Sequence, residues 1–110
     1  MRVTPIRASL QALQRNGADL TKPMPSKHRV ECQTRDIAER VRTWGESVGF
    51  EGSGIYVLQG HGGLEKYAVD LIVIDVPDPH DIREQALDII DEVSRIDGAV
   101  YATWTGAIVR

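Results

Sequence analysis

The sequence predicts an α+β fold in which two helices cover one face of a four-stranded antiparallel sheet. Three observations support this prediction. After a leading helix, the apolar patterns follow the order strand, helix, strand, strand, helix, strand, which is the split β-α-β order of ferredoxin-like domains. Each of the two later helices carries a single apolar stripe, which needs a sheet face to cover it. The chain of 110 residues also has the length of one domain.

The N-terminal segment, residues 1–26, is expected to hold a helix and an extended connection, while residues 27–110 form the core of a single domain. Over residues 4–15, apolar side chains recur at helical spacing. A Thr-Pro pair opens this helix and an Asn-Gly pair closes it. Its apolar stripe is narrow, so we expect the helix to lie across the main body. Residues 18–27 contain two prolines and are predicted to be extended.

The first strand and the first core helix come next. Residues 28–34 alternate in polarity, which predicts a strand with one buried face. The buried side of this strand holds three residues: His28, Val30 and Cys32. Thr34 or Asp36 is expected to cap the following helix, and a glycine followed by Phe50 predicts a Schellman-type end. The apolar face of that helix consists of Ile37, Ala38, Val41, Trp44 and Val48.

A hairpin and a second core helix complete the pattern. Two strand patterns, Ile55–Leu58 and Lys66–Val76, flank a glycine-rich loop that lets the chain reverse. Asp78 then caps the strongest helix pattern, with proline at its first position. The apolar face of this helix follows helical spacing over Ile82, Ala86, Ile89, Ile90, Val93 and Ile96. Residues 99–109 are expected to form the closing strand.

Aromatic residues on the sheet raise the question of RNA binding. Simple alternation places Tyr101 and Trp104 on opposite faces of the closing strand, and which face is buried stays open. Tyr56, Tyr67 or Tyr101 beside a tryptophan on the open face could stack bases, as in sheet-type RNA readers. The basic aromatic motif of those readers is missing from the sequence. Core packing of Trp104 is therefore favoured, and no direct nucleic-acid contact is expected.

Composition excludes several classes of protein. A single cysteine rules out an intrachain disulfide and a multi-thiolate metal site. No apolar run is long enough to cross a bilayer and the N-terminus lacks a signal-peptide pattern, so we expect a cytoplasmic protein without membrane contact. Residues 1–35 hold seven Lys or Arg against two acids, whereas residues 36–110 hold six against fourteen. The acidic body indicates either simple solubility or a charged partner.

No set of residues predicts catalysis, a metal or a cofactor. No two of His28, His61 and His80 lie at ligand spacing. The Gly60–Gly63 loop resembles a phosphate-binding loop only superficially, because the P-loop lysine is absent and a strand follows; whether it binds anything stays open. Cys32 falls on a buried strand face, where a thiol acts as a small hydrophobe. We therefore expect a protein that is not an enzyme.

The second core helix carries a row of acidic residues opposite its apolar face. They recur every three to four residues and comprise Asp81, Glu84, Asp88, Asp91 and Glu92. One interpretation is a solvated face whose acids favour the helix N-terminus. The functional interpretation is a docking surface for a basic protein partner, in which the charges steer association. Such a row also argues against RNA or DNA binding by this helix.

Three blocks of the sequence resemble a known family. They are residues 16–23 (NGADLTKP), the helix from Ile37 that ends in Val-Gly-Phe, and residues 97–104 (DGAVYATW). Taken in order, over residues 10–109, they resemble the regulator of ribonuclease E activity B family of ribonuclease E inhibitor-like proteins. The residues that carry the resemblance are Gly17, Asp19, Leu20, Lys22, Pro23, Tyr101 and Trp104.

The resemblance implies a ferredoxin-like, non-enzymatic, cytoplasmic regulator. The namesake of the family binds ribonuclease E and alters which transcripts it cleaves, so the implied partner is that nuclease or an associated degradosome component. The chain departs from the family where Ala102-Thr103 replaces Asp-Gly and where Thr105 replaces an acid. If those acids contact the partner, this protein binds something else. The alternative is a small-molecule sensor that acts as a homodimer, and self-association stays open.

Overall fold

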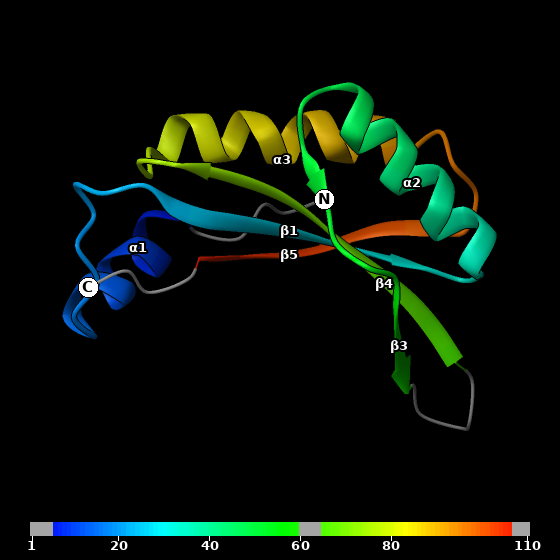
Figure 1. The fold of residues 1–110 in the computed structure, drawn as a ribbon, viewed down its shortest axis with the longest axis horizontal. Coiled ribbons are helices and arrows are strands. Elements are labelled where there is room, and N and C mark those ends of the chain that lie inside the picture. Colours follow the sequence, from blue (N-terminus) through cyan, green and yellow to red (C-terminus); the bar gives the residue numbers. More distant parts are fainter. Residues whose placement is uncertain (1–5, 60–64, 107–110) are drawn as a thin grey trace.

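The computed structural model describes residues 6–59 and 65–106 of the chain. Within them the elements follow one another as α1 (Ile6–Arg15), β1 (Met24–Cys32), α2 (Arg35–Ser47), β2 (Glu51–Gly52), β3 (Tyr56–Gln59), β4 (Glu65–Asp75), α3 (Pro79–Val93) and β5 (Ala99–Gly106). Helices α2 and α3 lie on the same side of the sheet (Figure 1). The predicted α+β class and the order of the elements are confirmed.

The sheet is antiparallel throughout the described residues. Strand β1 lies in its centre, between β4 and β5. Strands β2 and β3 both pair with β4, along the edge that β1 leaves open. The sheet therefore has the ferredoxin-like order, with β2 and β3 together in the place of one strand.

The second strand differs from the prediction, which placed one strand over Ile55–Leu58. The structure has β3 at nearly that position and a further short strand, β2, before it, because the chain leaves the ladder around Ser53. The Ser53 N–H donates to the Asp70 carbonyl at 2.9 Å, and the Ser53 hydroxyl oxygen accepts from the Asp70 N–H at 2.9 Å. The Ser53 hydroxyl thus takes the place of a backbone carbonyl as the hydrogen-bond acceptor. The N–H and the C=O of Asp70 therefore both keep a hydrogen bond where the ladder between the strands is interrupted.

The first strand begins at Met24, four residues before the predicted start. Residues 24–27 pair with residues 72–75 of β4. Met24 and Ser26 are buried, so they continue the alternation of His28, Val30 and Cys32, whose predicted burial is confirmed. The two prolines made this segment look like a connection. Pro25 is tolerated in the strand although it lacks an N–H, and the pairing with β5 begins only after it, at Ser26.

Local capping fixes the ends of both core helices. The Thr34 side chain accepts from the Ile37 N–H at 3.2 Å, so of the two predicted caps the structure selects Thr34. Asp78 accepts from the N–H groups of His80 and Asp81, as its sequence context predicts. At the end of α2, the Phe50 N–H donates to the Gly45 carbonyl at 2.9 Å. This is the long bond of a Schellman motif, and it directs Phe50 back over the sheet.

The closing strand contains a β-bulge, which corrects the prediction of simple alternation. Arg29 pairs with Thr103 but Val30 pairs with Tyr101, so Ala102 has no partner on β1. The extra residue rotates the strand, and Tyr101 and Trp104 consequently both point under the helices. The predicted core packing of Trp104 is confirmed.

The core divides into two clusters. The larger lies beneath α2 and α3 and includes Val30, Val41, Leu71 and Ile89. The smaller joins the N-terminal helix to the sheet and consists of Ile6, Leu10, Met24, Ile82 and Trp104. Helix α1 therefore packs across the body, against the N-terminal half of α3 and the end of β5, as its narrow stripe predicts.

Candidate protein-binding groove

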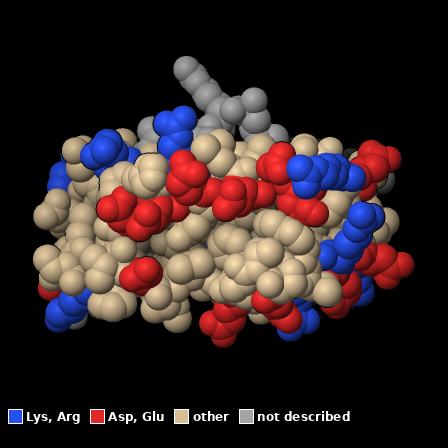
Figure 2. Space-filling view, turned by 90° about the horizontal axis from the view of Figure 1, so that it is seen from above, with Lys and Arg blue, Asp and Glu red and all other residues tan. Residues whose placement is uncertain are grey.

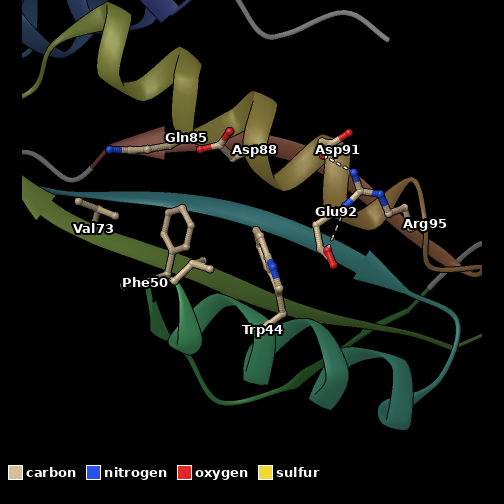
Figure 3. Close-up of a pocket in the computed structure, with 10 residues that line it drawn as sticks. Trp44, Phe50, Val73, Gln85, Asp88, Asp91, Glu92 and Arg95 are labelled. Atoms are coloured by element: carbon tan, nitrogen blue, oxygen red, sulfur yellow. Dashed lines mark hydrogen bonds and ion pairs between the residues drawn. The ribbon is translucent and has the colours of Figure 1, made fainter.

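A groove of about 440 Å³ separates α2 from α3. Its two walls differ in chemistry (Figure 3). Residues from the end of α2 and from the turn after it form an apolar wall, and α3 supplies a polar and acidic wall. The lining residues are Trp44, Val48, Gly49, Phe50, Val73, Gln85, Asp88, Asp91, Glu92 and Arg95.

The apolar wall follows from the sequence of α2. Trp44 and Val48 are four residues apart and so lie on the same side of the helix end. The Schellman motif turns Phe50 toward Trp44, and the two ring centroids are 6.3 Å apart at an interplanar angle of 37°. Val48 is 55% exposed, which is high for a valine beside an aromatic pair. The wall therefore offers apolar surface to solvent or to a partner.

The acidic wall contains three of the five acids that the sequence singled out. Asp88, Asp91 and Glu92 line the groove, whereas Asp81 and Glu84 lie outside it on the exposed side of α3. The acids nevertheless belong to one band. Figure 2 shows Asp and Glu side chains in a row across the helical face of the molecule. We call Asp81, Glu84, Asp88, Asp91 and Glu92 the α3 acidic stripe.

One end of the α3 acidic stripe is partly compensated by an arginine of the same chain and the other is not. The Arg95 guanidinium lies 2.8 Å from Asp91 Oδ2 and 3.9 Å from Glu92 Oε2. Among residues 6–59 and 65–106, no side chain forms an ion pair or a hydrogen bond with the carboxylates of Asp81, Glu84 or Asp88. The carboxylates without an internal cation therefore extend from the first turn of α3, at Asp81, to Asp88 beside the groove.

A buried histidine lies under the groove. His28 has no exposed surface, and its Nε2 lies 3.1 Å from Gln85 Oε1 while its Nδ1 lies 2.9 Å from the Tyr101 hydroxyl. Because the Gln85 oxygen can only accept, the proton is on Nε2, and Nδ1 accepts from Tyr101. Burial lowers the pKa of His28, although the Gln85 hydrogen bond opposes this. The ring is thus neutral and part of the core, and Gln85 connects it to the groove.

Sequence reasoning missed Gln85. The residue is polar and stands between Ile82 and Ile89, at the border of the apolar face of α3. That position is a weak signal, because a border glutamine is ordinarily solvated. Only the position of His28 on the neighbouring sheet shows that this glutamine has a buried partner.

Two other ionisable groups of the core are inert. Burial raises the pKa of the Cys32 thiol to about 11, with Glu31 adding to the effect, so the nucleophilic thiolate does not form at neutral pH. Burial also raises the pKa of the Tyr101 hydroxyl, which stays protonated as the donor to His28. Both groups are therefore structural.

The aromatic residues do not form a base-stacking platform. Tyr101 and Trp104 are in the core, and Tyr67 lies on the helix side of β4, beside the Arg35 guanidinium. Tyr56 is on the open face of the sheet, where its hydroxyl donates to Asp70 and accepts from Arg29, both at 2.9 Å. Of the three tyrosines that could stack RNA bases, Tyr56 alone is on the open face. Its hydroxyl is hydrogen-bonded to both members of the Arg29–Asp70 ion pair.

The described part of the chain holds no group of three or more His, Cys, Asp and Glu side chains that could bind a metal ion. His61 and the Gly60–Gly63 loop lie outside the described residues. His80 is exposed in the first turn of α3, far in sequence from His28. No helix within residues 6–59 and 65–106 is long and apolar enough to cross a membrane.

The residues that carry the family resemblance have structural contacts in the connection after α1 and in the core. Asp19 accepts hydrogen bonds from the Thr21 hydroxyl and the Thr21 N–H, and these bonds lower its pKa. Lys22 lies 3.9 Å from the same carboxylate. Leu20 packs against the smaller core cluster, to which Trp104 belongs. These residues hold the connection between α1 and β1 in place.

Comparison with known proteins identifies the family of this chain. The family model described as "Regulator of ribonuclease activity B" matches residues 6–105, which is nearly the whole chain. A search of curated proteins finds no match. The matched range includes both core helices, the whole α3 acidic stripe and the described strands except the last residue of β5, Gly106. The chain belongs to the regulator of ribonuclease activity B family.

Proposed function

We propose that this protein is a non-catalytic regulator that binds a ribonuclease of the ribonuclease E type, or a component associated with it, through the α3 acidic stripe and the groove beside it. The observation that carries the proposal is the groove itself. An exposed apolar wall faces a row of carboxylates, in a chain whose family consists of regulators of ribonuclease activity.

The sign of the charge favours the enzyme over its RNA substrate as the partner. RNA phosphates are repelled by a row of carboxylates. A ribonuclease, in contrast, must carry basic surface in order to hold RNA. A regulator with an acidic face can bind such a surface and thereby change the access of RNA to the enzyme. The stripe and the groove are therefore complementary to the nuclease and not to the nucleic acid.

The two walls have different tasks in this proposal. The unpaired carboxylates of Asp81, Glu84 and Asp88 are exposed, so they raise the association rate through long-range attraction. The apolar wall around Trp44 and Phe50 provides the surface whose burial slows dissociation. Neither task requires a catalytic group on this chain.

Binding and cleavage measured side by side test the proposal. Purified protein is titrated against the ribonuclease and, separately, against labelled RNA at low and moderate salt. We expect association with the nuclease that weakens as salt rises, no association with RNA, and an altered cleavage pattern when the protein is added to the nuclease reaction. Direct binding to RNA, or cleavage that is unchanged at concentrations that saturate the nuclease, would reject the proposal.

A further inference from the structure

The guanidinium of one of the protein's own arginines, Arg95, lies in the groove. Arg95 follows the end of α3, and its Nη2 lies 2.8 Å from Asp91 Oδ2 while its Nη1 lies 3.9 Å from Glu92 Oε2. Figure 3 shows this guanidinium between the two carboxylates, with the Trp44 ring on the opposite wall. The end of the groove therefore has the composition of an arginine site, with two acceptors and an aromatic ring across from them.

The ion pair that holds Arg95 is weak. The side chains of Arg95 and Asp91 are both 67% exposed, and they are related as i and i+4 on one helix end. Such a pair stabilises an isolated helix by a factor of only about two in an equilibrium constant. Exposed pairs of this kind are also screened by salt. Replacing Arg95 with another cation consequently costs little free energy.

We propose that the end of the groove formed by Asp91 and Glu92 is a guanidinium site for an arginine of the protein partner, and that Arg95 occupies this site in the free protein and is displaced on binding. This inference rests on the proposed function, since it names the chemistry of the segment that enters the groove. The occupant is an arginine-containing basic segment, with its next basic residue over Asp88.

Arginine fits this site better than lysine for two reasons. Its planar fork can face two carboxylates at once, as Arg95 does by donating to Asp91 at 2.8 Å while lying 3.9 Å from Glu92, whereas an ammonium is a point charge. Its flat face can also stack on an aromatic ring, and Trp44 lines the groove opposite the acids. The remaining acid of this wall, Asp88, has no internal cation among the described residues, so it is available to the partner without competition.

If an arginine of the partner displaces Arg95, substitution of Arg95 should change the binding affinity in an unusual direction. Removing an arginine that contacts the partner would weaken binding, but removing one that competes with the partner strengthens it. Arg95→Gln should therefore increase the affinity for a basic segment. Arg83 provides the matched control, because it is an exposed arginine on α3 that has no ion pair within the described residues and does not line the groove.

The experiment is a titration of the full chain with a fluorescent arginine-rich peptide and with its lysine-for-arginine equivalent. We expect Arg95→Gln to tighten arginine-peptide binding about two-fold or more, and by more than Arg83→Gln, which changes net charge equally. Asp91→Asn should weaken binding by about five-fold, and the lysine peptide should bind less tightly than the arginine peptide. Weaker binding by Arg95→Gln, or equal effects of Arg95→Gln and Arg83→Gln, overturns the inference. Because this titration uses a peptide in place of the nuclease, such a result would reject the guanidinium site alone. Whether the protein binds the nuclease is decided by the separate nuclease titration.

Discussion

The imidazole of His28 is hydrogen-bonded to the side chain of Gln85, with 3.1 Å between Nε2 and Oε1. A completely buried ring on the central strand is thereby tied to the helix that carries the acidic stripe. On its other side, the same ring contacts Phe50 in an edge-on arrangement with 6.1 Å between centroids. His28 thus contacts a residue from each wall of the groove, Phe50 and Gln85, from below.

The first prediction concerns acid stability. Burial lowers the pKa of His28 in the folded state below its ordinary value of about 6.5. Between the two pKa values the unfolded chain binds more protons, so the free energy of unfolding rises with pH there and falls as pH drops below about 6.5. The slope from this group is at most about 1.4 kcal/mol per pH unit. Urea denaturation across mildly acidic pH measures it.

Two variants isolate the contribution of His28 to that slope. His28→Phe should lose the part of the slope that His28 contributes, although it also lowers the stability at every pH by leaving Gln85 and Tyr101 without a partner. His80→Gln changes an exposed histidine and should retain the slope. An unchanged slope in His28→Phe would show that other groups cause the acid sensitivity.

The second prediction concerns the hydroxyl that holds His28. Tyr101→Phe removes the donor to a buried nitrogen, and an unsatisfied buried acceptor costs about 1–3 kcal/mol. We therefore expect a loss of about that size in the free energy of unfolding. Tyr67→Phe is the control, because the Tyr67 hydroxyl has no hydrogen bond within the described residues, and it should change stability by less than about 0.5 kcal/mol. Equal losses in the two variants would contradict the proposed role of Tyr101.

The third prediction concerns the turn that shapes the apolar wall. Gly49 has a φ of 101°, which an L side chain rarely adopts, and nothing would crowd an added Cβ there. Gly49→Ala should thus lower stability by roughly 1–2 kcal/mol through backbone strain alone. Gly54 also has open space around it but no positive φ, so Gly54→Ala should be neutral or raise stability by up to about 1 kcal/mol. Thermal unfolding of the pair checks the sign, and a loss at both positions would contradict the assignment of strain to Gly49.

The fourth prediction concerns steering by the stripe. Reversing two unpaired charges, as in Glu84→Lys with Asp88→Lys, should slow association with the nuclease by about ten-fold at low salt and leave folding intact. The matched control reverses two exposed acids elsewhere that also have no ion pair within the described residues, Glu51→Lys with Glu65→Lys, and has the same net charge. Stopped-flow or surface-based kinetics separate the two rates. If both double variants slow association equally, net charge and not the stripe controls the encounter.

The sequence predicted what is decided locally. Caps such as Asp78 and the glycine end of α2 depend on neighbouring residues, and the apolar faces of both core helices depend on spacing alone. The strand ends depend on pairing with distant residues, and there the prediction was wrong. Pro25 looks like a strand breaker until β4 is seen beside it, and the break at Ser53 depends on Asp70.

The site shows the same division. Helical spacing is sufficient to find the α3 acidic stripe, because all five acids are on one helix. The groove needs two helices and a strand, so no single segment contains its pattern. Likewise, the bulge at Ala102 arises from the register between β5 and β1, and without it Tyr101 could not lie on the same face as His28.

The two tryptophans show directly whether the groove between α2 and α3 binds the nuclease. Trp44 lines the groove, whereas Trp104 is in the smaller core cluster and does not. With ¹⁵N-labelled indoles, NMR spectra are recorded as the nuclease or its basic region is added. If the groove is the interface, the Trp44 indole resonance will shift or broaden while the Trp104 resonance keeps its position. Binding of the nuclease that leaves the Trp44 resonance unchanged would show that the interface lies elsewhere.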